Sequence, residues 1–105
     1  MVHHILLFTL QPHIAPKKLE EMMMNTRMQL LKIPEVRNLK CGKNIDPTND
    51  WKFFITADFE SMDKFAQYQE NPIHIKFIQE TLQPNTQEIL ELNYEMEPGK
   101  NVKYS

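Results

Sequence analysis

The sequence predicts an α+β fold in which a four-stranded antiparallel sheet carries helices on one face. Apolar residues alternate, or run continuously, in four segments that are typical of strands, 2–10, 36–45, 51–60 and 88–96. Apolar residues recur with helical spacing in two further segments, 16–32 and 61–82. The order strand, helix, strand, strand, helix, strand is that of the split βαβ, or ferredoxin-like, arrangement.

The first strand and the first helix have clear boundaries. Val2–Leu10 carries apolar residues at both parities, which predicts a strand covered on both faces. Pro16 is placed to begin the helix, where its missing N–H costs nothing, and Ile33-Pro34 ends it. One stripe of this helix is expected to face the core, and it comprises Leu19, Met22, Met23, Thr26, Leu30 and Ile33.

The two middle strands should form a hairpin. The segment 36–45 alternates weakly, and Gly42 is a candidate for a bulge or bend. The turn-forming residues 46–50 then lead into the clearest strand, 51–60. One face of that strand is expected to be apolar, with Trp51, Phe53, Ile55, Ala57 and Phe59.

The second helical segment is predicted to be interrupted. Ser61 is a suitable N-cap, and Asn71-Pro72 breaks the helix before a second piece that runs to about Leu82. The residues expected to face the core are Met62, Phe65, Tyr68, Ile73, Phe77, Ile78 and Leu82. Residues 1–97 would then form one domain, and 98–105 a polar tail.

Composition restricts the partners. The chain has 105 residues, a net charge of −2 and one cysteine, Cys41, so it lacks a field that would attract nucleic acid, and it cannot form an internal disulfide. No apolar run approaches the roughly 20 residues of a membrane helix, and a cytoplasmic location is expected. One sheet face is left uncovered by so short a chain, which predicts a homodimer, most simply with twofold symmetry.

Five short stretches, in order and at fitting spacing, resemble the stress-responsive A/B barrel family, Dabb. They are Val2 to Phe8, Ile33-Pro34-Glu35-Val36, Gly42-Lys43-Asn44, Asp58-Phe59-Glu60-Ser61 and Tyr68-Gln69-Glu70-Asn71-Pro72-Ile73-His74. The resemblance extends to about Met96, and it implies a dimeric α+β barrel in which two sheets face each other.

The resemblance also suggests site residues. By position, His74 and Tyr68 match the catalytic histidine and tyrosine of a plant polyketide cyclase of this family, and His4 matches a pocket histidine. Where that enzyme has a further tyrosine, a histidine and an aspartate, this chain has Thr26, Phe53 and Asn93. A His74 base would therefore need another orienting partner, and the resemblance does not transfer the cyclase reaction itself.

Three functions stay open at this point. A homodimeric barrel would bind a small apolar or aromatic compound in a pocket lined by His4, Phe53, Ile55, Tyr68 and His74. A cofactor-free lyase or cyclase would use the same pocket, with His74 as base and Tyr68 as hydrogen-bond donor to a developing enolate. A stress-related structural protein would use neither a ligand pocket nor catalysis, and His74 and Tyr68 would be hydrogen-bonded packing residues.

Other reactive side chains suggest no site. His3 and His4 are adjacent on a strand and point to opposite faces, so they cannot share a metal, and no metal or cofactor is expected. Cys41 has no local base that would activate it, so we expect it to be idle. Met24, Met28 and Leu31 form a second apolar band on the first helix; they are either scattered surface residues or a seat for the tail, residues 101–105, or another dimer.

Overall fold

A computed structural model describes residues 1–97 of the chain, so the predicted tail 98–105 lies outside the described residues. The elements follow the predicted order, and they are β1 (Val2–Leu10), α1 (Pro16–Leu30), β2 (Arg37–Lys43), β3 (Phe53–Phe59), α2 (Met62–Glu70), α3 (Pro72–Phe77), the π-helical turn η1 (Ile78–Leu82) and β4 (Thr86–Glu95). The strands pair antiparallel in the order β2-β3-β1-β4. The predicted ferredoxin-like, split βαβ fold is confirmed.

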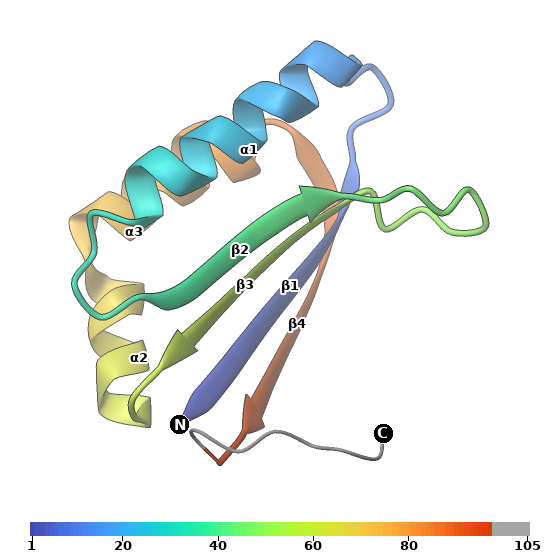
Figure 1. Ribbon diagram of the computed structural model, residues 1–105. Helices are drawn as coiled ribbons and strands as arrows, with labels where there is room; N and C mark the ends of the chain where they lie inside the picture. Colours follow the sequence, from blue (N-terminus) through green and yellow to red (C-terminus); the bar gives the residue numbers. More distant parts are fainter. Residues whose placement is uncertain (98–105) are drawn as a thin grey trace.

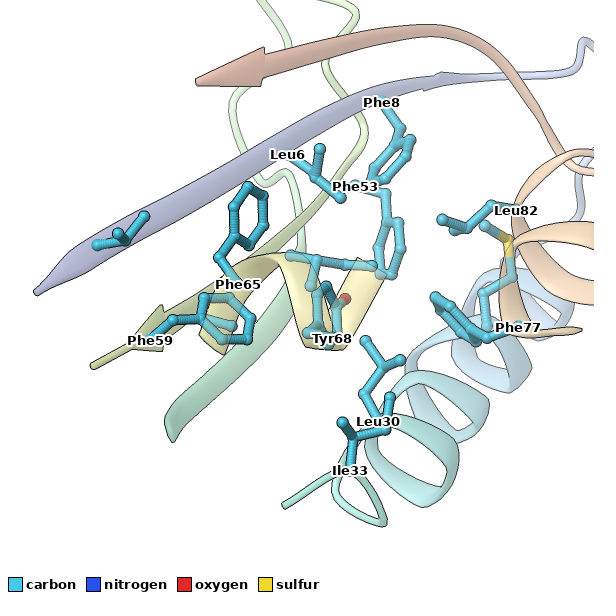
Figure 2. Close-up of a cluster of buried hydrophobic side chains, with 14 residues drawn as sticks. Leu6, Phe8, Leu30, Ile33, Phe53, Phe59, Phe65, Tyr68, Phe77 and Leu82 are labelled. Carbon is cyan, nitrogen blue, oxygen red and sulfur yellow. The ribbon is translucent and has the colours of Figure 1, made fainter. Parts of the chain in front are cut away.

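The helices lie together on one face of the sheet, and the core lies between them and the two central strands (Figure 1). Burial alternates along β1, so that His4, Leu6 and Phe8 face the helices while Ile5 and Leu7 face the other way. Phe53, Ile55, Ala57 and Phe59 of β3 face the helices beside them, as predicted, and Figure 2 shows aromatic rings of both strands in this cluster. The strands β1 and β3 therefore supply most of the sheet side of this core.

Helix α1 begins at Pro16 and buries the predicted stripe. Met22, Thr26 and Leu30 are buried, and the hydroxyl of Thr26 donates a hydrogen bond to the Met22 carbonyl oxygen at 2.8 Å. The helix ends at Leu30, about two residues before the predicted end, and the N–H of Leu31 still donates to the Arg27 carbonyl oxygen at 3.3 Å. A turn in which the Ile33 N–H donates to the Leu30 carbonyl then carries Ile33 into the core.

The break between α2 and α3 is formed by Asn71. Its backbone is extended, with φ −65° and ψ 130°, and its N–H donates to the Tyr68 carbonyl at 3.1 Å. Its side-chain oxygen accepts from the N–H of Ile73 at 2.9 Å, so that one residue ends the first helix and caps the second. Ser61 caps α2 as predicted, accepting from the N–H of Lys64 at 3.2 Å.

Two local predictions are wrong, and a third feature was not foreseen. Met62 is 62% exposed instead of facing the core, because it lies in the first turn of α2 at the end of the sheet. Gly42 pairs regularly with Phe54; the bulge of β2 lies between Arg37 and Lys40, where Asn38 has a φ of 49°. The helical segment ends in a π-turn, with the Gln83 N–H donating to the Ile78 carbonyl at 2.9 Å.

The sheet face away from the helices is open within residues 1–97. Its apolar side chains include Ile5 and Leu7 of β1, Phe54 of β3, and Leu90 and Tyr94 of β4, which are cross-strand neighbours. Leu90 and Tyr94 are 38% and 53% exposed. The predicted cover over both faces of β1 is therefore absent from the single chain.

The outer surface of α1 carries the second apolar band. Met24, Met28 and Leu31 are all exposed, and the tail proposed to cover them lies outside the described part of the chain. No helix in residues 1–97 has the length and apolar character needed to span a membrane.

Candidate functional site

Three side chains that can carry or exchange a proton meet at the helix-facing side of the sheet. Tyr68 comes from α2, His74 from α3 and His4 from β1. The rings of Tyr68 and His74 have their centroids 4.2 Å apart, and those of His4 and Tyr68 are 6.4 Å apart. The extended backbone at Asn71 lets both helices direct a ring to one place.

His4 is held by the neighbouring edge strand. Its Nδ1 lies 2.6 Å from Oδ1 of Asn93, which is its register partner on β4. The side chain is only 3% exposed and its ring packs on Phe65, with centroids 4.9 Å apart. This burial lowers the pKa of His4, although Asn93 and the charge of Glu91 act in the opposite direction. His4 is therefore a neutral imidazole at neutral pH.

His74 takes its partner from the preceding helix. Its Nδ1 lies 3.2 Å from the carbonyl oxygen of Gln69, and a carbonyl can only accept, so Nδ1 carries the hydrogen and Nε2 keeps a lone pair. Burial lowers the pKa of His74, opposed by the Gln69 hydrogen bond and by Glu91. The orienting partner sought for His74 is thus a backbone carbonyl, which the side-chain pattern of the sequence cannot display.

The pKa of Tyr68 is shifted in the opposite direction from that of His74. The side chain is 2% exposed, and burial, aided by the charge of Glu91, raises its pKa, so the phenol stays protonated. Its hydroxyl has no hydrogen-bond partner within residues 1–97. It is not among the fully buried side-chain polar atoms that lack a partner, which in this part of the chain comprise only Glu35 Oε2, so the hydroxyl oxygen keeps some contact with solvent. Figure 2 shows Tyr68 beside Phe59 and Phe65. A protonated donor without a partner is therefore available beside a neutral imidazole.

The helices leave the adjacent side of β4 uncovered. Ile89, which shares this side, is 53% exposed, and Glu91 and Asn93 are exposed as well. A pocket of about 500 Å³ lies at the end of this strand, and its lining comprises Met1, Val2, Glu60, Ser61, Met62, Asn93, Tyr94 and Glu95. The pocket shares Asn93 with the His4 contact, and the exposed Met62 belongs to its wall.

The remaining predicted site residues lie in the core. Phe53 and Ile55 are each 1% exposed, and Phe53 packs on Phe8 with ring centroids 5.5 Å apart. They support the sheet from which His4 projects. Thr26 is likewise a core residue of α1.

Glu91 was not predicted as a site residue. It lies two positions before Asn93 on the same side of β4, and its Oε2 accepts a hydrogen bond from Asn93 Nδ2 at 2.9 Å. Its charge acts on His4, His74 and Tyr68. In the sequence, the only indication was that Glu91 lies two residues before Asn93, so that both point to the same side of a strand. That spacing identifies a site residue only when the side of the strand that faces the site is known.

His3 lies on the opposite sheet face from His4, as predicted. Its Nδ1 is 2.6 Å from Oδ1 of Asp58, whose other oxygen accepts from Asn38 at 2.9 Å. Over residues 1–97, no three His, Cys, Asp or Glu side chains are grouped as a metal site would require. Cys41 is partly buried, and burial raises the pKa of its thiol.

The four-stranded antiparallel sheet with its helices on one face (Figure 1) defines an α+β domain of the ferredoxin-like class. The chain belongs to the stress-responsive A/B barrel domain family, Dabb, whose model matches residues 2–96. No curated protein matches the chain.

Solved structures with the same fold come from bacteria and plants. A Dabb family protein with a ferredoxin-like fold from Mesorhizobium loti has a TM-score of 0.81 at 21% identity, over 91% of this chain and 96% of its own. A dimeric ferredoxin-like protein of unknown function from Thermobifida fusca has 0.82 at 22%, over 90% of each chain. The hydroxynitrile lyase from Passiflora edulis has 0.80 at 19%, over 95% of this chain and 96% of its own. At these identities the likeness concerns the fold.

Proposed function

We propose that this protein binds a small, neutral, apolar or aromatic compound beside Tyr68, His74 and His4. The observation that carries the proposal is the hydroxyl of Tyr68, which has no hydrogen-bond partner among residues 1–97 and whose ring centroid lies 4.2 Å from that of His74. A buried tyrosine usually gives its hydroxyl a partner, so a free one adjacent to an exposed strand is suited to a ligand atom. Phe59 and Phe65 pack on the Tyr68 ring and hold it in place.

The same pair supports a second candidate, a cofactor-free lyase. A neutral imidazole with a free Nε2 can accept a proton at pH 7, and a phenol that stays protonated can stabilise an oxyanion. With a cyanohydrin, Nε2 of His74 would take the hydroxyl proton. The C–CN bond would then break as the carbonyl forms, and cyanide would leave with the electron pair. The hydroxynitrile lyase among the similar folds makes this reaction the first to test.

The assembly that we propose is a cytoplasmic homodimer formed through the open sheet face. Ile5, Leu7 and Leu90 place an apolar surface there, and soluble monomers rarely leave a large patch of this kind in water. The dimeric relative from Thermobifida fusca supports the same choice. Residues 1–97 would be the barrel domain and 98–105 a tail.

The test combines binding and turnover. Acetophenone is titrated into the protein and followed by NMR, and mandelonitrile cleavage is followed through the absorbance of benzaldehyde. We expect acetophenone to bind wild type, and His74→Ala to lower mandelonitrile cleavage by roughly 10² or more if the pair is a lyase. If His74→Ala changes neither affinity nor any turnover, the enzymatic candidate fails; if no neutral aromatic compound binds, the binding proposal fails.

A further inference from the structure

Glu91, Asn93 and His4 form a continuous chain of hydrogen bonds from solvent to the candidate site. Glu91 and Asn93 lie on the helix-facing side of β4, opposite Leu6 and His4 of β1. Asn93 Nδ2 donates to Glu91 Oε2 at 2.9 Å, and Asn93 Oδ1 lies 2.6 Å from His4 Nδ1. An amide thus connects a carboxylate to a buried imidazole.

The Glu91 carboxylate determines the direction of every hydrogen bond in this series. An ionised carboxylate can only accept hydrogen bonds, so it requires the NH₂ group of Asn93 and excludes the flipped amide, which would direct oxygen at oxygen. The amide oxygen must then face His4. Because that oxygen can only accept, the hydrogen of the neutral His4 ring lies on Nδ1, and Nε2 keeps its lone pair.

We propose that Glu91 is a positioning residue that acts through Asn93 to hold His4 in the Nδ1–H tautomer, so that His4 Nε2 accepts a hydrogen bond from the ligand. The inference rests on the proposed function, and it specifies the ligand class. His4 and His74 offer acceptors and Tyr68 offers a donor, which together match a neutral compound that bears a hydroxyl group. A carboxylate would be repelled by Glu91, whose charge acts on all three rings.

In this proposal, the hydrogen-bonded pair Glu91 and Asn93 takes the place of the aspartate that the plant cyclase has and this protein lacks. An aspartate at position 93 would orient an imidazole directly and place a charge next to it. Asn93 instead orients His4 without a charge, and Glu91 supplies the charge from two residues away on the exposed strand. In this proposal, the His4 imidazole keeps a fixed orientation, and the side chains next to the ligand are uncharged.

The test reads the tautomer of His4 by long-range ¹H–¹⁵N correlation in the full chain, with no ligand present. We expect the Nδ1–H form in wild type and in Glu91→Gln, whose side-chain oxygen still accepts from Asn93. Glu91→Ala should give a mixture of tautomers. Glu95→Ala, which removes a carboxylate from the same side of β4, is the matched control and should leave His4 unchanged. Thermal unfolding verifies that each variant is folded.

A second measurement compares ligand classes. Wild type should bind benzyl alcohol more tightly than benzoate, and Glu91→Gln should reduce that preference by about tenfold. An Nε2–H tautomer in wild type, or an unchanged tautomer in Glu91→Ala, overturns the positioning role. Failure of every neutral compound to bind, with the tautomer fixed as expected, overturns the proposed function alone.

Discussion

Tyr68 and His74 have opposite shifts in proton affinity although their rings are in contact. Burial raises the pKa of the phenol and lowers that of the imidazole, so each is held in its neutral form near pH 7. A neutral donor and a neutral acceptor can bind an uncharged carbonyl or hydroxyl without a counter-ion. They can also exchange a proton with it, which links the binding and lyase candidates.

Removing the Tyr68 hydroxyl should separate stability from function. In Tyr68→Phe the unfolding free energy should change by less than about 1 kcal/mol, because the hydroxyl has no hydrogen-bond partner in the described part of the chain. Affinity for acetophenone should fall about fivefold or more. Urea unfolding and NMR titration measure the two quantities. Tyr94→Phe on the open sheet face is the control, and equal losses of affinity in both variants would contradict the role of Tyr68.

The buried histidines should make the fold less stable in acid. A lowered pKa in the folded state means that the unfolded chain binds more protons, so stability rises with pH. The penalty begins as the pH falls through the unfolded value of about 6.5 and is complete below the folded value. We expect wild type to lose more stability than His74→Gln between pH 7.5 and 5. Parallel curves in urea unfolding would refute this.

The candidate site residues could be named from the sequence, but their hydrogen-bond partners could not. Tyr68, His74 and His4 were suggested by their positions in the family resemblance, and their proximity became visible only in the fold. The partner of His74 is the main-chain oxygen of Gln69, and every residue has such an oxygen. Glu91 can be assigned to the candidate site only when the strand register places it beside Asn93.

At the scale of elements, Asn71 joins the two helices that carry the pair. In Asn71→Ala the cap on the Ile73 N–H is lost, so stability should fall by about 1 kcal/mol. His74 should also lose its fixed position relative to Tyr68, and ligand affinity should fall with it. Asn71→Asp keeps an acceptor oxygen and should restore both. Thermal unfolding and NMR titration test this, and an Asn71→Ala protein with unchanged affinity would show that the break does not position the pair.

Element types and order followed from apolar periodicity, whereas local irregularities did not. The stripe of α1 and the buried face of β3 are strong periodic signals, and both were predicted. The π-turn at Ile78–Leu82 and the bulge at Asn38 are single irregularities, and the side chains of Asn85 and Thr86 bond the carbonyl oxygens of Thr81 and Leu82, four residues earlier. Features of this kind leave no apolar period in the sequence.

At the scale of the whole molecule, the open sheet face should hold two copies together. Leu90→Asp places a charge among Leu7 and its apolar neighbours, and we expect it to halve the particle mass in light scattering. Lys17→Asp, on the exposed side of α1, should leave the mass unchanged. A wild-type mass equal to one chain would contradict the dimer, and so would a Leu90→Asp dimer.

An NMR titration of the wild-type protein with a neutral aromatic hydroxyl compound, benzyl alcohol, tests the proposed ligand site directly. We expect saturable shift changes at Tyr68, His74, His4 and Asn93, with smaller changes in Tyr68→Phe. Saturable changes confined to the open sheet face or to the band on α1, or no saturable change at all, would contradict it.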